Sequence, residues 1–349
     1  MIADYETAFP LKWEQKTFRA RAAAVSFPTM NRSPQKLAFE RVSRPFRVPV
    51  KTARGTATAR ESLVVSIRDD AGRAGRGEIA PWDGFGCETL DAAEAALRAL
   101  AEHAGTPESL ADAVPARLPC TRHALAAAAF FLDNPAELAA PEPTPAAACR
   151  LIPRDAAEAP ETLAEKIRRA HAEGFRAVKI KIGLAALADE VALCDALLRL
   201  AAESFPDARL RFDANGAWRD AAALDALAPL AAFPQLEFVE QPLAPAPEND
   251  AAVLALPRER AAKIALDESL REPWTLPDDA PVVAVVKPLL VGDFPRLRAW
   301  LRRENAAPRF VLSSVFETDV GRSVLRALCA RADGNPRALA AGVGTRAFF

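Results

Sequence analysis

A regular alternation of short β-rich runs and helical stretches constrains the fold of this chain most. From residue 148 onward, runs rich in Val, Ile, Leu and Phe recur, each separated from the next by a stretch of helical character. The eight runs read ACRLI, AVKIKIG, RLRFDANG, LEFVEQPL, AKIALDES, PVVAVVKP, RFVLSSV and LAAGVGT. Parallel strands need long, usually helical, crossover connections, so this rhythm predicts a (β/α) barrel whose site lies at the carboxyl ends of the strands.

The chain before the barrel has a different pattern. Residues 36–80 contain strand-like runs joined by Asp and Gly turns, and residues 87–105 then have helical spacing up to a Gly. A Pro-rich joint, PAELAAPEPTPAA, follows. We therefore predict an N-terminal extension, arm or strap over residues 1–35 and an α+β domain over residues 36–140. Residues 141–349 form the predicted barrel, with a C-terminal segment that could return to the first domain.

The overall composition favours a small-molecule ligand. Of the 349 residues, 50% are hydrophobic and 26% charged, and the net charge is −1, so bulk charge indicates neither a nucleic acid nor a membrane surface as partner. The N-terminal segment resembles neither a secretory signal nor a membrane span. We expect a cytoplasmic protein, a monomer or a homo-oligomer.

The cysteines are odd in number and far apart in the sequence. None is part of a CxxC pair, which argues against a disulfide framework and against a zinc site, and favours reduced thiols. The five positions are Cys87, Cys120, Cys149, Cys194 and Cys329.

Two lysines lie on one face of the second predicted strand. Successive side chains of a strand point to opposite faces, so Lys179 and Lys181 share one side while Val178 and Ile180 share the other. An isolated strand of this kind would most simply expose its lysines to solvent. The residues at the ends of the following strands argue otherwise.

Four further charged residues occur at the ends of successive predicted strands. They follow Lys181 at intervals of 20 to 32 residues, about one strand and helix each, and are Asp213, Glu240, Asp267 and Lys287. Three converging carboxylates without a partner would cost several kcal/mol each to bury, and a divalent cation removes that cost. Because all three ligands are hard oxygen donors, we predict Mg²⁺, with Mn²⁺ as a substitute.

This set of residues indicates proton abstraction from a small-molecule carboxylate substrate. A metal-bound carboxylate has a more acidic α-proton because the cation stabilises the enediolate formed on deprotonation. A lysine can act as the base only when neutral, and we expect Mg²⁺ and Lys179 to lower the pKa of Lys181 through like charge. Lys287 is expected on the opposite side of the metal.

The motifs KIK, DAN, EQP, DES and VKP resemble those of the enolase superfamily, in its muconate-lactonising branch, from about residue 36 to the end. This resemblance implies an α/β fold, with an N-terminal α+β capping domain and a (β/α)7β TIM-like barrel. It also implies that Lys181 and Lys287 are the catalytic acid/base pair. The implied metal ligands are Asp213, Glu240 and Asp267.

Within that branch, the chain is most similar to the o-succinylbenzoate synthase family. The run RESLVVSIRDDAGRAGRGEIAPWDGFGCETL and the C-terminal LSSVFETDVG and GVGTRAFF carry this similarity. It implies a hydro-lyase that converts 2-succinyl-6-hydroxy-2,4-cyclohexadiene-1-carboxylate to o-succinylbenzoate by syn-dehydration in menaquinone or phylloquinone biosynthesis. The long N-terminal extension and Trp82-Asp83, where the family often has Leu-Pro, depart from the pattern.

Several further residues are candidates for substrate binding. Arg211 shares a strand face with Asp213, although a salt bridge within the barrel would explain it equally well. The hydroxyls of Ser313 and Ser314 and the backbone of the GVG segment could receive a second carboxylate. The full predicted set is Lys179, Arg211, Asn215, Ser313, Ser314, Gly342 and Gly344.

Two other functions use the same residues. An N-acylamino acid racemase or dipeptide epimerase would exchange protons through both lysines, but dipeptide-specific relatives usually carry an acidic Asp-x-Asp near the last strand, and LAAGVGT has no acid. A metal-stabilised binding barrel would need the carboxylates but not both amines.

Two cap segments, KTARGTATAR and PWDGFG, are expected to be loops that close over the barrel mouth.

Overall fold

A computed structural model describes residues 36–52, 55–82, 85–101, 107–304 and 308–349. All of these residues belong to one compact unit. The predicted N-terminal extension, residues 1–35, lies outside the described residues, as do Asp83 and His103. The proposed division into a cap and a barrel at residue 140 stays a prediction.

The first sheet is antiparallel, with three strands in the order β1-β2-β3. Its strands are β1 (Lys36–Thr52), β2 (Gly55–Arg68) and β3 (Ala74–Ile79). The segment KTARGTATAR was expected to be a loop; apart from residues 53–54, which are not described, its residues are in β1 and β2. Cross-strand pairs such as Lys51 with Thr56 continue the ladder almost to the tip, which makes this segment a hairpin end.

Three helices accompany this sheet: α1 (Leu90–Ala101), α2 (Pro107–Ala113) and α3 (Pro119–Asp133). The backbone of α3 runs directly against β3. A Cβ atom at Gly75 or Gly77 would lie 1.9 Å from the carbonyl oxygen of Ala128 or 2.1 Å from that of Ala124, respectively, so only glycine fits at both places. This contact explains the two glycines in the AGRGEI sequence of β3.

The second sheet is parallel and has seven strands in sequence order. They are β4 (Cys149–Ile152), β5 (Ala177–Lys181), β6 (Arg209–Asp213), β7 (Leu236–Glu240), β8 (Ile264–Leu266), β9 (Val283–Val286) and β10 (Phe310–Leu312). The eighth β-rich run closes the barrel, because Ala341 pairs with Ala148 before β4 and Gly342 pairs with Ser313 after β10, both in parallel. The backbone N–H of Cys149 donates to the Ala341 carbonyl at 2.8 Å.

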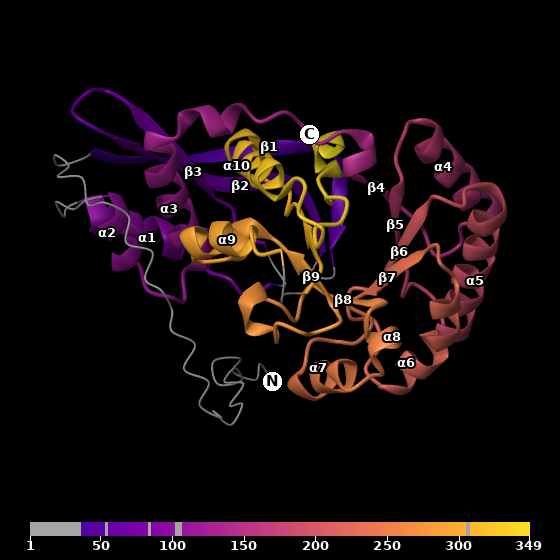
Figure 1. Ribbon diagram of the computed structural model, residues 1–349. Coiled ribbons are helices and arrows are strands. Elements are labelled where there is room, and N and C mark those ends of the chain that lie inside the picture. Colours follow the sequence, from indigo (N-terminus) through magenta and orange to yellow (C-terminus); the bar gives the residue numbers. More distant parts are fainter. Residues whose placement is uncertain (1–35, 53–54, 83–84, 102–106, 305–307) are drawn as a thin grey trace. The chain divides into compact units, whose positions relative to one another are not determined.

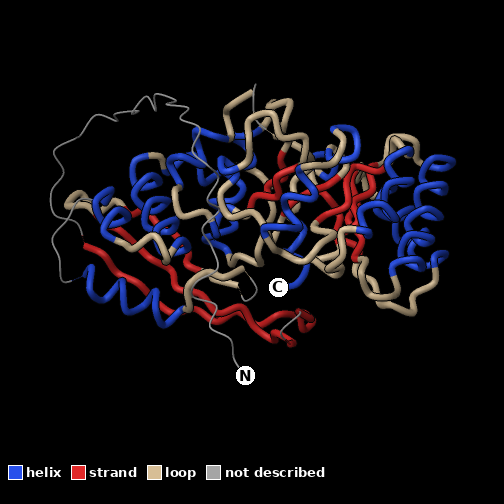
Figure 2. Tube along the Cα trace, turned by 90° about the horizontal axis from the view of Figure 1, so that it is seen from below, coloured by secondary structure: helices blue, strands red, loops and turns tan. Residues whose placement is uncertain are grey.

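Helices cover the outer face of the parallel strands, as the blue coils around the red strands show in Figure 2. They are α4 (Pro160–Ala172), α5 (Leu187–Ser204), α6 (Ala222–Leu227), α7 (Pro247–Leu254), α8 (Arg258–Ala261), α9 (Phe294–Trp300) and α10 (Asp319–Ala332). Figure 1 shows α4 and α5 beside β4, β5 and β6. Along α5, Leu193, Leu197 and Leu198 are buried at helical spacing, which gives the apolar stripe that packs on the sheet.

One connection departs from the predicted alternation. Every residue between β8 and β9 is described, and the only helix there is the single 3₁₀ turn η5 (Pro273–Thr275). Pro273, Pro277 and Pro281 recur every four residues in this stretch, so a helix would lose N–H donors on successive turns. The other 3₁₀ turns are η2 (Pro135–Ala139), η3 (Pro145–Ala147), η4 (Ala228–Ala232), η6 (Pro288–Leu290) and η7 (Gly344–Phe348).

The antiparallel sheet is joined to the barrel through a buried carboxylate. Glu78 of β3 is 1% exposed and accepts hydrogen bonds from the backbone N–H of Thr318 at 3.0 Å and of Gly321 at 2.7 Å. These N–H groups belong to the start of α10, whose N-cap residue makes no side-chain cap of its own. The C-terminal Phe349 also packs against Phe46 of β1, with ring centroids 5.0 Å apart.

Among the described residues, no helix combines the length and apolarity that a membrane span requires.

Candidate active site

The charged residues predicted at the strand ends converge at one end of the barrel. Lys181, Asp213 and Glu240 are directly paired across β5, β6 and β7, so they lie at the same level. Asp267 follows β8 two residues after Ala265, the partner of Glu240, and Lys287 follows β9. Strand alternation therefore points all five side chains to the inside of the barrel.

Beneath these residues part of the barrel interior is apolar. Phe238, Ala265, Val283, Val285 and Val311 form a buried cluster of their own. Phe238 and Ala265 each lie two residues before a predicted metal ligand on the same strand face. The charged groups thus lie next to buried apolar side chains, where charge–charge interactions are stronger than in water.

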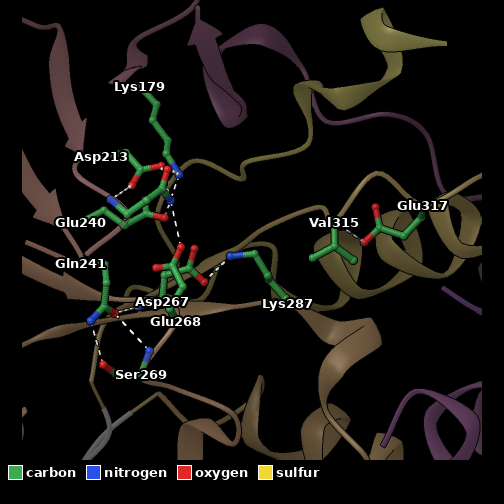
Figure 3. A network of polar contacts seen from close by, with 11 residues as sticks. Lys179, Asp213, Glu240, Gln241, Asp267, Glu268, Ser269, Lys287, Val315 and Glu317 are labelled. Carbon is green, nitrogen blue, oxygen red and sulfur yellow. Dashed lines mark hydrogen bonds and ion pairs between the residues drawn. The ribbon is translucent and has the colours of Figure 1, made fainter. Parts of the chain in front are cut away.

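Lys179 is held between two of the three carboxylates. Its Nζ lies 2.9 Å from Oδ2 of Asp213 and 2.7 Å from Oε1 of Glu240. Lys287 forms an ion pair with Asp267, and Figure 3 shows the two amines reaching the carboxylates from different sides. Two ammonium groups therefore already partner the three carboxylates.

Burial and the neighbouring charges shift the pKa values of this cluster in different directions. Burial raises the pKa of Glu240 to about 8; Lys179 opposes this shift, whereas Asp213 and Asp267 add to it. Burial also raises the pKa of Asp267, with Lys287 opposing it. For Asp213, burial is outweighed by Lys179 and Lys181, and its pKa is lowered. Burial thus favours the protonated forms of Glu240 and Asp267, and a bound cation would act against that effect.

The donor set fits Mg²⁺. Asp213, Glu240 and Asp267 are each at least nine-tenths buried, and they offer only oxygen ligands from adjacent strands. The raised pKa of Glu240 reflects unrelieved repulsion among the carboxylates as well as burial, and a divalent cation would relieve both. These three residues would hold the metal, and Lys179 would then move from its present contacts.

Residues next to the predicted ligands hold them in place. Asn215, with a left-handed φ of 45°, donates from its backbone N–H to Asp213 at 3.0 Å and from Nδ2 to Glu268 at 2.9 Å. Gln241 accepts at Oε1 from the backbone N–H of Asp267 at 2.9 Å. Asn215 was predicted to bind substrate; in the structure its hydrogen bonds go to carboxylates. Glu268 and Gln241 were not predicted, although the DES and EQP motifs place each directly after a predicted ligand.

A buried ion pair supports the backbone of Lys181. Arg154 follows β4 and donates from Nη1 to the Lys181 carbonyl at 3.2 Å and to Glu190 at 2.7 Å. The other Glu190 oxygen accepts from the backbone N–H groups of Leu184 and Ala185, both at 2.8 Å. The side chains of Arg154 and Glu190 are 4% and 0% exposed. This pair fixes the turn that begins at Lys181, and no local pattern in the sequence signals it.

Lys287 is covered by an aromatic ring from the segment between β3 and α1. Its Nζ lies 4.6 Å from the centroid of the Phe85 ring, and the Arg271 guanidinium lies 5.5 Å from the same centroid. A ring face attracts a cation, so Phe85 both shields the amine from water and contributes to holding it in place. Trp82, in the departure from the family pattern, stacks on Phe316 with centroids 5.1 Å apart.

Arg211 lies inside the barrel below the carboxylates. It is 1% exposed, its Nε donates to Glu237 at 2.6 Å, and its guanidinium lies 5.0 Å from the Phe238 ring centroid. This is the salt bridge weighed as the alternative. Its buried Nη2 has no hydrogen-bond partner among the described residues, so one donor remains and substrate binding stays a prediction.

The predicted substrate-binding residues near the C-terminal end of the chain differ in their contacts. The Ser314 hydroxyl contacts Glu317 and lies 2.6 Å from the Thr345 hydroxyl, so the protein itself uses it. Ser313 and Gly342 are neighbours, and a Cβ at Gly342 would lie 3.1 Å from the Ser313 hydroxyl. Gly344 begins η7. The substrate contacts of these residues stay predictions.

A cavity of about 650 Å³ lies elsewhere in the molecule. It is lined by residues of η2, by residues that directly follow α9 and by the C-terminal end of α10, and by none of the predicted site residues. Helices of a barrel run back toward the amino ends of the strands, so this cavity belongs to the opposite end from the carboxylates. The strand-end cluster remains the candidate active site.

Comparison with known proteins gives the family. A family model described as enolase C-terminal domain-like matches residues 162–280. An o-succinylbenzoate synthase from Thermosynechococcus vestitus is 33% identical over 288 residues, which cover 80% of this chain and 84% of that protein. The chain belongs to the o-succinylbenzoate synthase family. Another member of the family, from Pectobacterium atrosepticum, is 30% identical over 301 residues, which are 84% of this chain and 86% of that protein.

Solved structures agree with this membership. The o-succinylbenzoate synthase from Thermosynechococcus elongatus BP-1, complexed with Mg in its active site, superposes with a TM-score of 0.71 at 28% identity, covering 89% of this chain and 93% of that one. A dipeptide epimerase from Methylococcus capsulatus, complexed with Mg and the dipeptide L-Arg-D-Lys, has a TM-score of 0.70 at 23% identity and covers 90% and 91%; it shares the fold. The predicted enolase superfamily fold is confirmed, and the chain is an enzyme.

Proposed function

We propose that this enzyme is an o-succinylbenzoate synthase. It would convert 2-succinyl-6-hydroxy-2,4-cyclohexadiene-1-carboxylate to o-succinylbenzoate by a Mg²⁺-dependent syn-dehydration, as a step of menaquinone or phylloquinone biosynthesis. The observation that carries the proposal is the convergence of Lys181 and Lys287 on three buried carboxylates, in a chain of this family. A lyase of this kind needs both a proton carrier and a fixed positive charge.

Asp213, Glu240 and Asp267 would hold the metal, for which Mn²⁺ could substitute. When bound, Mg²⁺ supplies positive charge that makes the α-proton of a carboxylate substrate more acidic. Lys179, now paired with Asp213 and Glu240, lies where it would then contact the substrate carboxylate.

Lys181 would move the proton. Its Nζ takes the α-proton of the substrate, and the C–H electron pair forms a new ring double bond as the C–O bond to the ring hydroxyl breaks. The same ammonium returns the proton to the departing hydroxyl on the same face, so the products are one water and one aromatic ring. The hydrogen bond from Arg154 to the Lys181 carbonyl at 3.2 Å holds the strand end from which the side chain projects.

Lys287 would remain charged throughout the reaction. It faces the carboxylates through Asp267 and lies under the Phe85 ring, so it supplies positive charge in a place from which water is shielded. A fixed cation near developing negative charge contributes several kcal/mol to the transition state. In a dehydration, Lys181 would therefore transfer the proton, and Lys287 would supply a fixed positive charge.

The experiment follows aromatisation of the cyclohexadiene substrate by purified enzyme at saturating Mg²⁺. Lys181→Arg should lose turnover to near background, because arginine keeps its proton. Lys287→Arg should keep measurable turnover, because it keeps the charge. Lys166→Arg, at a partly exposed α4 lysine that pairs with Glu158, is the matched control and should behave as the unmodified enzyme.

Two results would contradict the proposal. Substantial o-succinylbenzoate formation by Lys181→Arg would remove its role as the base. Absence of aromatisation by the unmodified enzyme, together with exchange of the α-proton of N-acylamino acids or dipeptides that both Arg variants abolish, would indicate racemisation or epimerisation.

A further inference from the structure

Two cysteines that are distant in the sequence meet outside the carboxylate cluster. Cys87 lies in the segment between β3 and α1, and Cys120 is the second residue of α3. Their Sγ atoms and a carboxylate oxygen of Glu88 all lie within 4.8 Å of one another. Cys120 is 0% and Glu88 8% exposed, while Cys87 is partly exposed, so the three ligand atoms form a mostly buried group with one open side.

The spacing of these atoms suits a tetrahedral metal ion. Zinc binds thiolates at about 2.3 Å, which places two sulfur ligands about 3.8 Å apart around a tetrahedral centre. The present separations, within 4.8 Å, are therefore about 1 Å or less from those of a bound ion. Changes of side-chain rotamer can make up that difference without moving α3.

The surroundings also place positive groups near the two thiols. Glu88 accepts hydrogen bonds from the backbone N–H of Cys120 at 3.2 Å and of Thr121 at 2.7 Å, at the N-terminus of α3, which has 15 residues. Burial, the contact with Cys87 and the charge of Glu88 raise the pKa of the Cys120 thiol well above its ordinary value, so a bound cation would have to displace the thiol proton. The positive helix end would offset part of that cost. Arg271 is a further positive group near Cys87. Two thiolates, one carboxylate and a divalent cation carry a net charge of −1, which these groups offset.

Glu88 can accept hydrogen bonds from the N-terminus of α3 and bind a metal ion at the same time. A carboxylate has about four acceptor positions, and Glu88 uses them for two backbone N–H groups and the Thr121 hydroxyl at 3.0 Å. Oε2 accepts the N–H of Cys120 at 3.2 Å, and the Cys120 thiol also hydrogen-bonds the Glu88 side chain. A metal ion would take the place of that thiol proton and so use the same lone pair for a ligand bond. The open side, at Cys87, would take water as the fourth ligand.

We propose that Cys87, Cys120 and Glu88 form a second metal site, for a thiophilic divalent cation of the zinc class. It differs in chemistry from the carboxylate cluster, whose oxygen ligands favour Mg²⁺. An ion there ties the segment before α1 to the start of α3. Phe85, two residues before Cys87, covers Lys287, so occupancy of this site would hold that ring over the amine.

The experiment titrates the full-length, Mg²⁺-saturated enzyme with Cd²⁺ in a phosphine reductant and records the ultraviolet sulfur-to-cadmium charge-transfer absorption. This signal reports thiolate ligation and does not depend on catalysis. We expect one equivalent to bind, and Cys87→Ser to weaken binding at least about tenfold. Cys329→Ser, at a partly buried cysteine of α10 outside the group, should titrate as the unmodified enzyme.

Two further samples separate this proposal from the proposed function. Asp213→Asn, which damages the carboxylate cluster, should keep the charge-transfer signal even if it is inactive. A Cys120→Ala variant, included because Cys120 is fully buried, should lose the signal while its near-ultraviolet circular dichroism stays that of a folded protein. Three results would each overturn the proposal. They are absence of the signal in the unmodified enzyme, an unchanged Cd²⁺ affinity in Cys87→Ser, and a count of only three free thiols, which would show that two cysteines form a disulfide.

Discussion

Binding of Mg²⁺ should become weaker as the pH falls, because Glu240 must lose a proton to act as a ligand. The pKa of Glu240 is raised to about 8, and its largest cause is burial. With that pKa, roughly half of the metal-free molecules carry an ionised Glu240 at about pH 8, but only about 1% at about pH 6. The apparent dissociation constant for Mg²⁺ should therefore be about 50-fold larger at about pH 6, which is about 2.3 kcal/mol.

Isothermal titration calorimetry measures this effect directly. Titrations of Mg²⁺ at about pH 6, 7 and 8 give the affinity, and two buffers of different ionisation enthalpy at each pH give the protons released. Close to one proton should leave per Mg²⁺ at about pH 6, and about half a proton at about pH 8. Glu240→Gln should bind Mg²⁺ weakly and with little dependence on pH, since it has no proton to lose.

A constant affinity across this range, with no proton release, would refute the reasoning. It would mean that Lys179, which pairs with Glu240 at 2.7 Å, keeps the carboxylate ionised in solution despite its burial. A retained pH dependence in Glu240→Gln would instead assign the proton to another group, of which Asp267 is the first candidate because burial also raises its pKa.

Other perturbations test the neighbouring structure. In chelator, the free energy of unfolding measured by urea denaturation should fall as the pH rises from about 4.5 to about 8, because folded Glu240 binds a proton more tightly than the unfolded chain does. Added Mg²⁺ should remove this decline. A free energy of unfolding that does not change with pH in chelator would contradict the prediction. Arg154→Met should destabilise the protein by about 3–5 kcal/mol because it leaves Glu190 buried without its partner, and a loss below about 1 kcal/mol would show that the pair is not structurally important. Glu78→Gln should cost about 1–3 kcal/mol in the same assay by weakening two hydrogen bonds to the start of α10, and unchanged stability would contradict that role. Phe85→Ala should lower kcat for aromatisation more than it raises KM, whereas a change in KM alone would limit Phe85 to substrate binding.

The barrel and the positions of its charged residues were predictable because both depend on short-range pattern. Each strand is a run of a few residues whose alternation assigns Lys181, Asp213 or Glu240 to the inner face, and parallel strands end on the same side. The alternation of strands and helices predicted an α-helix between β8 and β9, where the structure has only a 3₁₀ turn. The prolines at 273, 277 and 281 carried the contrary signal.

What could not be predicted depends on which segments meet. Arg154 and Glu190 are 36 residues apart, and nothing local in either segment marks one as the partner of the other. Cys87 and Cys120 were read as unrelated thiols because metal motifs are recognised at short spacing, whereas here the packing of α3 beside β3 brings them together. The same holds for Ser314, whose partner Thr345 belongs to the last segment of the chain.

The contact between Glu78 and the start of α10 sets an order of events during translation. Its hydrogen-bond partner Thr318 is made 240 residues later, which at about 5–20 residues per second is roughly 10–50 s on the ribosome. Throughout that time the antiparallel sheet can form. The Glu78 carboxylate, however, lacks the backbone N–H groups of Thr318 and Gly321 as hydrogen-bond donors. A nascent chain stalled before α10 should therefore expose Glu78 to water or to a chaperone, and the antiparallel sheet should become resistant to protease only when the last helix has left the exit tunnel.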